Sequence, residues 1–260
     1  MLKFSIIIPT FNSEKYLEKT LKSIDDQTYQ NYEVIICDNH STDNTTKIIS
    51  KFIKDNKRIK LIVRKDLGVA DALNFGFENS NGDILCWLNS DDYYFDNTIL
   101  DSVGQKIGNY DYLVGNFINI DRYGNLIKYF YAFIPQKKIK KLFFYNQIFT
   151  GSLFFKKYTF KKFDINFKFS FEYDLLFFLL KTYHGIYLDK FLACFRILPN
   201  ALSSNKKELK KEFFELIYRY NLSYSNNIFL RTFCYIKHKT LHKVIKSKVK
   251  YLLKEFNFKV

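Results

Sequence analysis

Two adjacent carboxylates, Asp91 and Asp92, follow the apolar run 84–88 after Asn89 and Ser90. Such a pair repels itself unless a cation or hydrogen-bond donors neutralise it. Hard divalent ions such as Mg²⁺ and Mn²⁺ bind a few carboxylate oxygens together with the phosphates of a substrate. The alternative role is capping the next helix, although Asp96 lies closer to that helix. The pair therefore indicates either a metal–phosphate site or a helix cap.

Three further carboxylates could act on a bound substrate. Asp38 ends a second apolar run, where it could bond a nucleobase or ribose, or only the backbone of its own turn. Glu172 and Asp174 begin the apolar segment 171–183, where the helix dipole favours acids and where one could act as a general base. Residues two apart on a helix do not share a face, so we expect at most one of them in the site.

The elements that must position these groups alternate between strand and helix over the first 100 residues. Continuous apolar runs predict strands at 4–12, 32–39, 59–65 and 82–89. Capped amphipathic segments predict helices at 13–27, with Ser13 as N-cap, at 41–55 and at 69–80. This order predicts an α/β fold with a mostly parallel sheet, in which ligands bind beyond the carboxyl ends of the strands. Four strand ends would share that edge, and three of them carry carboxylates.

The pattern is looser after residue 100. We expect two strands around the turn 121–125, a strand and a short helix within 151–163, and a pair of β segments in 186–198. From about Ser203 the chain is rich in Lys and reads as helical, with a polar break at 221–227.

The net charge of +15 is unevenly distributed. Residues 1–100 carry 12 basic and 15 acidic side chains, whereas residues 101–260 carry 29 and 11. The basic half indicates an anionic partner, such as a membrane surface or a phosphorylated substrate, or only a solvated basic surface. A nucleic-acid-binding protein would carry basic residues at the strand ends, where this chain has acids, so we expect no nucleic acid partner.

The cysteines, at 37, 86, 194 and 234, have no metal-binding spacing, so we expect neither a zinc site nor a disulfide framework. We find no signal-peptide pattern and no run of about 18 uncharged apolar residues. The expectation is a cytoplasmic protein that could attach peripherally to the inner face of the cell membrane. Its basic amphipathic segment 241–256 would either lie on an anionic membrane or pack on the domain.

Read in order, these motifs resemble those of the inverting family 2 glycosyltransferases of the GT-A fold. Residues 5–45 are similar to the family's strand, Pro-Thr-aromatic-Asn, helix, Gln-Thr, strand and Asp-x-x-Ser-Thr-Asp. Residues 65–94 are similar to its Gly-x-x-x-Ala-x-Asn-x-Gly segment and metal-binding Asp-x-Asp region. The resemblance covers residues 4–100 strongly and 146–204 more weakly.

The resemblance implies a site for a nucleotide-sugar. Its residues would be Pro9, Thr10, Phe11, Asp38, Asp66, Gly68, Asp71, Asn74, Asn89, Asp91 and Arg196. Asp38 would bond the base, usually uracil, and Asp92 would ligate the Mn²⁺ or Mg²⁺ ion that bridges the diphosphate, with Asp91 on the ribose or the metal. Glu172 aligns with the family's catalytic base, with Asp174 two residues on.

The chain departs from the family pattern at three positions. Asn89 replaces the first acid of the metal motif, and Leu198 stands where relatives often have His. Glu172 replaces the family's Asp, so the base is either Glu172 or Asp174. Arg196 could reach the diphosphate or form a structural ion pair.

The resemblance implies a GT-A domain over 1–202, with a nucleotide-sugar half (1–100) and an acceptor half (101–202), and then a basic helical extension (203–260) that could contact an anionic membrane. The implied reaction moves a sugar from a UDP-sugar to a hydroxyl of a glycan or lipid-linked saccharide, for capsule or lipopolysaccharide (O-antigen) assembly. A metal-dependent nucleotidyltransferase is the main alternative, although the Gly-rich phosphate loop that it needs after the first strand is absent.

Overall fold

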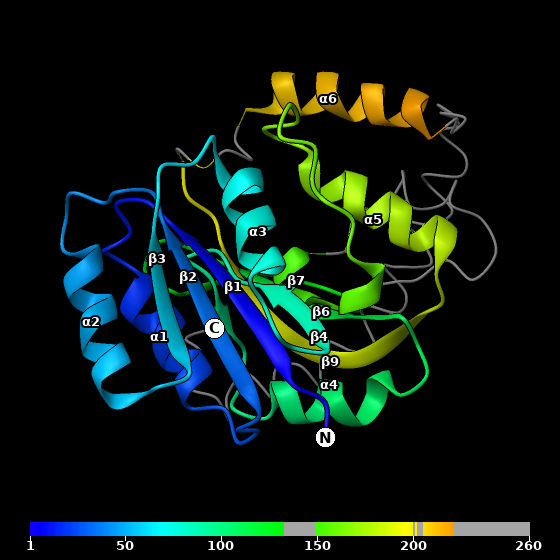
Figure 1. Cartoon of the computed structure of the whole chain (residues 1–260). Coiled ribbons are helices and arrows are strands. Elements are labelled where there is room, and N and C mark those ends of the chain that lie inside the picture. The colour runs from blue at the N-terminus through cyan, green and yellow to red at the C-terminus, as the bar shows by residue number, and fades with distance from the viewer. Residues whose placement is uncertain (133–148, 200, 202–204, 221–260) are drawn as a thin grey trace.

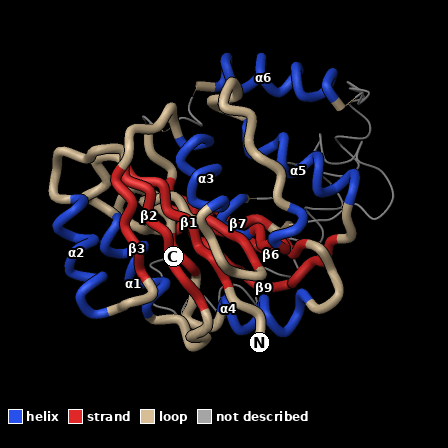
Figure 2. Tube along the Cα trace, in the orientation of Figure 1, coloured by secondary structure: helices blue, strands red, loops and turns tan. Residues whose placement is uncertain are grey.

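The computed structural model describes residues 1–132, 149–199, 201 and 205–220 (Figure 1). A single curled sheet runs through the molecule, with helices on both of its faces (Figure 2). Its first four strands are parallel and lie in the order β3-β2-β1-β4. They are β1 (Phe4–Thr10), β2 (Tyr32–Asp38), β3 (Ile59–Val63) and β4 (Ile84–Trp87). The predicted α/β fold and its four parallel strands are confirmed.

Three helices cover the two faces of these strands. They are α1 (Leu17–Asp25), α2 (Thr45–Asp55) and α3 (Val69–Glu78). Helices α1 and α2 pack on the face that carries Ile6 and Ile8, whereas α3 packs on the face that carries Ile7. Strands β1, β2 and β4 are mostly apolar because both of their faces are buried, whereas the edge strand β3 is partly exposed.

The predicted N-cap of the first helix is wrong. Helix α1 begins at Leu17, after a turn in which the Ser13 carbonyl accepts bonds from the backbone N–H groups of Tyr16 and Leu17. The Ser13 hydroxyl lies 2.7 Å from that of Ser90, in the loop after β4. Ser13 therefore belongs to the loops at the carboxyl edge of the sheet rather than to the helix.

The second half extends the same sheet. Strands β8, β6, β9 and β5 follow β4 in that order, and β7 pairs with β6 in the expected hairpin. The strands are β5 (Tyr93–Tyr94), β6 (Tyr112–Ile120), β7 (Leu126–Phe130), β8 (Leu153–Lys156) and β9 (Gly185–Arg196). The other elements are α4 (Ile99–Ile107), the 3₁₀ turns η2 (Thr150–Ser152) and η3 (Lys157–Thr159), α5 (Phe171–Thr182) and α6 (Lys206–Arg219).

One continuous strand replaces the pair of β segments predicted in 186–198. Strand β9 pairs with β6 along its length, but the register shifts around Asn116, where Asp189 and Lys190 have no strand partner. Asp189 accepts a bond from Asn116, and Lys190 contacts Thr98. The two β segments predicted here are therefore one strand with a β-bulge at Asp189 and Lys190.

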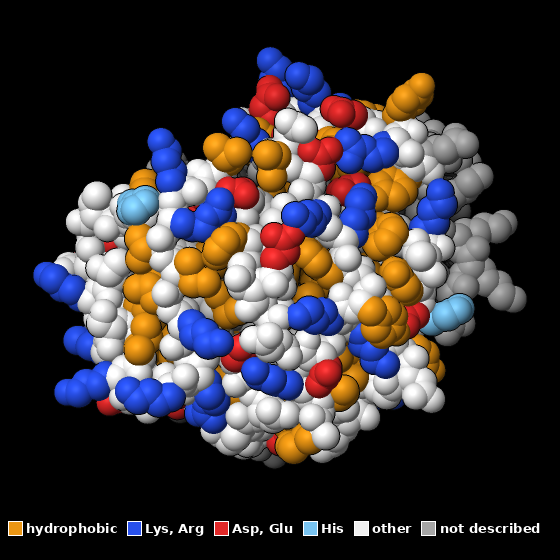
Figure 3. Space-filling model, in the orientation of Figure 1, with side chains coloured by type: hydrophobic (Ala, Val, Ile, Leu, Met, Phe, Trp, Pro, Cys, Tyr) orange, Lys and Arg blue, Asp and Glu red, His pale blue; other side chains and the backbone are white. Residues whose placement is uncertain are grey.

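Helix α6 packs on α5, with Leu216 fully buried. None of the helices in the described ranges is long and apolar enough to span a membrane. Of the four cysteines, Cys37, Cys86 and Cys194 are free and buried. Cys234, the polar break at 221–227 and the amphipathic segment 241–256 lie outside the described residues. The membrane contact predicted for the extension therefore stays a prediction. On the face of the described domain in Figure 3, Lys and Arg side chains are spread over the surface with Asp and Glu among them.

Candidate active site

A cavity of about 610 Å³ lies between the carboxyl edge of the parallel strands and the start of α5. Nine of the residues predicted for the site line it, namely Pro9, Thr10, Phe11, Asp66, Gly68, Asn89, Asp91, Glu172 and Arg196. The other predicted residues, Asp38, Asp71, Asn74, Asp92 and Asp174, are not among its lining residues. The carboxyl edge thus gathers most of the predicted site, as expected from the strand order.

Asp38 lies directly behind Thr10 and is fully buried. Its Oδ1 accepts hydrogen bonds from the hydroxyls of Thr10 (2.9 Å) and Ser41 (2.6 Å), and its Oδ2 accepts one from the Ser41 backbone N–H (2.8 Å). In this structure Asp38 therefore ties the end of β1 to the loop after β2. The next residue, Asn39, is the one that lines the cavity.

The loop before α3 is fixed by its own carboxylates. Asp66 accepts a bond from the Gly68 backbone N–H (2.9 Å), and burial raises the pKa of its carboxyl group. Gly68 has φ of 122°, a backbone conformation that favours glycine. Asp71 forms an ion pair with Arg64 (3.0 Å), and Asn74 bonds both the N–H and the carbonyl of Phe163. Asp71 and Asn74 therefore hold the walls of the site together rather than face its interior.

The adjacent carboxylates Asp91 and Asp92 have different surroundings. Asp92 is fully buried, and its two oxygens accept bonds from the Arg196 backbone N–H (2.8 Å) and the Asn89 amide (3.0 Å). Burial, followed by repulsion from Asp91, raises the pKa of Asp92 well above its ordinary value. Asp91 is only partly buried and lines the cavity. Neither residue caps α4, because Asp96 accepts bonds from the N–H and hydroxyl of Thr98 just before that helix.

The Asp91 carboxylate could bind a metal ion, because it faces the cavity. Burial raises the pKa of its carboxyl group, a shift that a bound cation would reverse. The Arg196 guanidinium nearby bonds the backbone carbonyl of Asp91 (3.0 Å). The described residues contain no group of three or more His, Cys, Asp or Glu that could hold a metal. A lone carboxylate of this kind suits Mg²⁺ or Mn²⁺ bound mainly through substrate phosphates and water.

Glu172 lies in the first turn of α5 and lines the opposite wall of the cavity. Burial raises the pKa of its carboxyl group to about 7, and within the part of the chain that the structure describes the one contact that lowers it is a long hydrogen bond from the Thr150 hydroxyl (3.4 Å). A carboxylate with a pKa near neutrality can both accept and hold a proton at physiological pH, which is what a general base requires.

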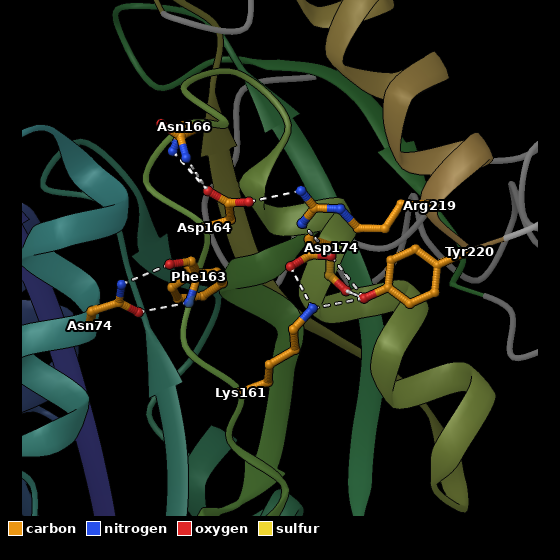
Figure 4. A network of polar contacts seen from close by, with 8 residues as sticks. All are labelled: Asn74, Lys161, Phe163, Asp164, Asn166, Asp174, Arg219 and Tyr220. Atoms are coloured by element: carbon orange, nitrogen blue, oxygen red, sulfur yellow. Dashed lines mark hydrogen bonds and ion pairs between the residues drawn. The ribbon is translucent and has the colours of Figure 1, made fainter.

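Asp174, two residues further along α5, is held in a polar network (Figure 4). Its Oδ2 pairs with Lys161 (2.7 Å), and its Oδ1 accepts a bond from the Tyr220 hydroxyl (2.8 Å). Arg219 lies 3.8 Å from the same carboxylate. The side chain is 1% exposed, so its oxygens are committed to structure. As the helical spacing predicts, only one of the two acids faces the cavity.

Arg196 lines the cavity but forms no carboxylate ion pair within the described ranges. Its guanidinium bonds the backbone carbonyls of Asp91, Asp121 and Arg122. It also stacks on Tyr16, 4.2 Å from the ring centroid. Arg196 therefore joins the end of β9 to the β6–β7 turn and brings a positive charge to the cavity.

Part of the cavity wall was not among the residues predicted from the sequence. Among the missed residues are Ser13, Asn39, Ser90, Asn119, Lys168, and a run of aromatic side chains: Phe117, Phe130, Phe149, Phe169, Tyr173 and Phe195. Phe117 and Phe130 are stacked, with centroids 4.8 Å apart, and Phe149 lies 4.8 Å from Phe195. The number of Phe and Tyr residues gives no way to tell these from core aromatics, so the sequence carried no signal for them.

Comparison with solved structures gives the class of fold. S. aureus TarS 1–349, solved in complex with UDP-GlcNAc, matches with a TM-score of 0.63 and 22% identity, over 84% of this chain and 65% of that chain. The mannosyltransferase PcManGT from Pyrobaculum calidifontis, in complex with GDP-Man and Mn²⁺, matches with a TM-score of 0.63 and 15% identity, over 84% and 64%. At these identities the likeness shows the fold alone, and that fold is GT-A.

Sequence comparison gives the family. The family model described as "Glycosyl transferase family 2" matches residues 5–168, so the chain belongs to this family. The GalNAc(5)-diNAcBac-PP-undecaprenol beta-1,3-glucosyltransferase of Campylobacter jejuni is 30% identical over 203 residues, which are 76% of this chain and 65% of that protein. An uncharacterized glycosyltransferase of Haemophilus influenzae is 36% identical over 126 residues, or 48% and 50%. The chain thus spans half to about two-thirds of these relatives' lengths.

Proposed function

We propose that this chain is an inverting glycosyltransferase that moves a sugar from a UDP-sugar to a hydroxyl of a glycan or lipid-linked saccharide. The family match supports this hypothesis over the nucleotidyltransferase and nucleic-acid-binding alternatives. The Campylobacter relative named for an undecaprenol-linked substrate supports a lipid-linked acceptor and a role in bacterial surface polysaccharide assembly. The complex of TarS with UDP-GlcNAc supports a UDP-sugar as donor.

A single observation carries the proposal. Glu172 faces the same cavity as Asp91 and the carboxyl edge of the parallel sheet, and its pKa is about 7. An enzyme that activates a hydroxyl group needs a base of this strength, positioned across the cavity from the group that leaves.

In this proposal the donor binds along the carboxyl edge of the sheet. The loop Pro9–Phe11 and Asn39 would contact the nucleoside, and Phe11 is 61% exposed and free to do so. Asp38 would act by holding Thr10 in place. The loop at Asp66–Gly68 would contact the sugar, and the positive charge of Arg196 would face the diphosphate.

We place the metal on Asp91 rather than on Asp92. Asp91 lines the cavity, whereas both oxygens of Asp92 already accept hydrogen bonds within the protein. Asn89, which also lines the cavity, would supply an amide to the ribose or to the metal's water shell. An ion bound there, Mn²⁺ or Mg²⁺, would neutralise charge that develops on the leaving diphosphate.

The reaction is then a single displacement. Glu172 accepts the proton of the acceptor hydroxyl as its oxygen attacks the anomeric carbon, and the bond from that carbon to the diphosphate oxygen breaks. Attack occurs on the face opposite the leaving group, so the configuration at the anomeric carbon inverts. The aromatic wall formed by Phe117, Phe130, Phe149 and Phe195 would give the acceptor's sugar ring an apolar surface.

The test is metal-dependent binding of a nucleoside diphosphate, with Asp91→Asn and Asp92→Asn as a matched pair. UDP with Mn²⁺ should raise the melting temperature of the wild type, because a ligand at 100 times its Kd adds about 2.7 kcal/mol to the unfolding free energy. Asp91→Asn should lose the metal-dependent part of this rise, whereas Asp92→Asn should keep it. The proposal fails if no nucleoside diphosphate with Mn²⁺ or Mg²⁺ stabilises the wild type. If Asp92→Asn instead loses the metal-dependent rise and Asp91→Asn keeps it, the metal ligand is Asp92.

A further inference from the structure

Helix α6 contributes to the cavity although it follows the residues that the family model matches, 5–168. Leu209 on α6 lines the cavity, as does Ala201 before it. Leu216 is fully buried against α5, and the Phe213 ring lies 5.3 Å from that of Tyr173. Figure 1 shows α6 lying across the top of α5. This helix is therefore part of the wall around the start of α5.

Glu212 on α6 accepts four hydrogen bonds from the residues just before α5. Its Oε1 accepts a bond from the Lys168 N–H (3.0 Å), and its Oε2 accepts bonds from the N–H groups of Phe169 and Ser170 (2.9 Å each). The Ser170 hydroxyl is a fourth donor, also at 2.9 Å. Ser170 occupies the N-cap position of α5, yet its side chain does not cap the helix because it bonds Glu212. The carboxylate also lies where a helix dipole favours negative charge.

A second anchor lies one turn further along α5. Asp174 is held by the Tyr220 hydroxyl at the end of α6 and by Lys161, and Arg219 on α6 pairs with Asp164 at 2.8 Å (Figure 4). Helix α6 thus fixes α5 at Ser170 and again at Asp174. Glu172, the proposed base, lies midway between these two fixed positions.

We infer that Glu212 is a positioning residue for Glu172: by binding the three consecutive N–H groups of residues 168–170, it fixes the start of α5 and so the place of the Glu172 carboxylate in the cavity. This inference rests on the proposed function. Lys168 and Phe169, whose backbone N–H groups also bond Glu212, line the same cavity. The Glu212 carboxylate would therefore fix the positions of both the base and the cavity wall beside it.

The test compares Glu212→Gln with Glu215→Gln, a matched change at an exposed position of the same helix. The amide offers one acceptor oxygen and no charge to four donors, so the start of α5 should loosen. The assay is release of UDP from whichever of UDP-glucose and UDP-N-acetylglucosamine the wild type hydrolyses faster, with Mn²⁺. A base displaced by about 1 Å loses on the order of 10²-fold, so kcat of Glu212→Gln should fall roughly 10–100-fold. The KM for the donor should change little, because the carboxyl edge of the sheet is untouched.

Two further measurements separate positioning from general support of the fold. Adding Glu212→Gln to a Glu172→Gln protein should cost no further activity, because there is no base left to misplace. Glu212→Asp keeps the charge on a shorter side chain and should recover part of kcat; it also replaces Glu212→Gln if that variant does not fold. Independent effects of Glu212→Gln and Glu172→Gln, or equal kcat values for Glu212→Gln and Glu215→Gln, would overturn the inference.

Amide hydrogen exchange tests the anchor without any turnover. Exchange at residues 168–172 should be faster in Glu212→Gln than in Glu215→Gln, because the three N–H groups lose their charged acceptor. Equal exchange in the two variants would overturn the inference. If the wild type releases no UDP from any donor, the proposed function fails, and exchange alone still decides whether Glu212 holds the start of α5.

Discussion

The stability of the protein should depend on pH through Glu172, and replacing this residue should stabilise the fold at alkaline pH while removing activity. Burial raises the pKa of this carboxyl group from an ordinary value of 4.5 to about 7. Between these two values the folded protein binds a proton that the unfolded chain does not. Stability must therefore fall as the pH rises through this window.

The size of the effect follows from the shift. One pKa unit corresponds to about 1.4 kcal/mol, so the ionised Glu172 carboxylate costs the folded state at most about 3.5 kcal/mol above pH 7. Glu172→Gln removes the charge and keeps the shape, so it should raise the unfolding free energy by up to this amount at pH 8. For a domain of this size the melting temperature should rise by roughly 7–14 °C at most. At about pH 4, below the ordinary value of 4.5, the carboxyl group is mostly protonated in both the folded and the unfolded protein, so the two proteins should melt at nearly the same temperature.

The assay is thermal unfolding at about pH 4 and pH 8, with Glu18→Gln as the control because Glu18 is exposed on α1. Glu172→Gln should also lose roughly 10²–10⁴-fold in kcat, which is the usual contribution of a positioned base. The wild-type kcat/KM should fall about tenfold per unit below pH 7, where Glu172 becomes protonated. A Glu172→Gln protein that melts like the wild type at pH 8 would refute the burial argument. One that keeps its activity would refute the role as base.

The remaining predictions concern residues that hold the site together, each checked by urea unfolding. Asp92→Ala leaves the buried N–H of Arg196 without its acceptor and should cost about 1–3 kcal/mol, whereas Asp92→Asn keeps an acceptor oxygen and should cost less. Asp174→Ala removes the partner of Lys161 and Tyr220 and should cost about 2–3 kcal/mol of unfolding free energy. A urea midpoint equal to that of the wild type would show that this network does not stabilise the fold. Gly76→Ala places a Cβ against the Ile7 side chain, and the overpacking, about 1–3 kcal/mol, should exceed the helix-propensity gain of about 1 kcal/mol. An unchanged or raised midpoint would show that Ile7 can move aside.

The parallel half of the fold could be predicted because each of its signals is local. A strand buried on both faces, such as β1 or β2, is a continuous apolar run, and its end is marked by the first polar residues. The order of these strands then brings their ends together. The second half lacks such signals, because β9 bends at a bulge whose cause, the shift against Asn116, lies in another strand. The polar pair Asp189-Lys190 alone gives no sign that the strand continues, because the bulge depends on pairing with Asn116 of β6.

The choice between Asp91 and Asp92 could not be read from the sequence for a similar reason. Asp91 and Asp92 lie between β4 and β5, so the alternation of side chains along a strand does not say which of the two faces inward. The inward one is Asp92, because the backbone N–H of Arg196, 104 residues away, provides a buried donor for it. The resemblance implies a binding role for both residues. This long-range hydrogen bond distinguishes them, because it holds Asp92 behind the cavity while Asp91 lines it.

The choice between the two acids of α5 also depends on residues that are distant in the sequence. Helical geometry allows only one of Glu172 and Asp174 to face the cavity, but it does not say which. Asp174 is turned away because Lys161 and Tyr220, 13 and 46 residues distant, supply a cation and a hydroxyl on its side of the helix. Among the described residues Glu172 accepts only the long Thr150 hydrogen bond, and burial raises the pKa of its carboxyl group to about 7. The contacts of Asp174 with Lys161 and Tyr220 therefore leave Glu172 as the acid of α5 that faces the cavity.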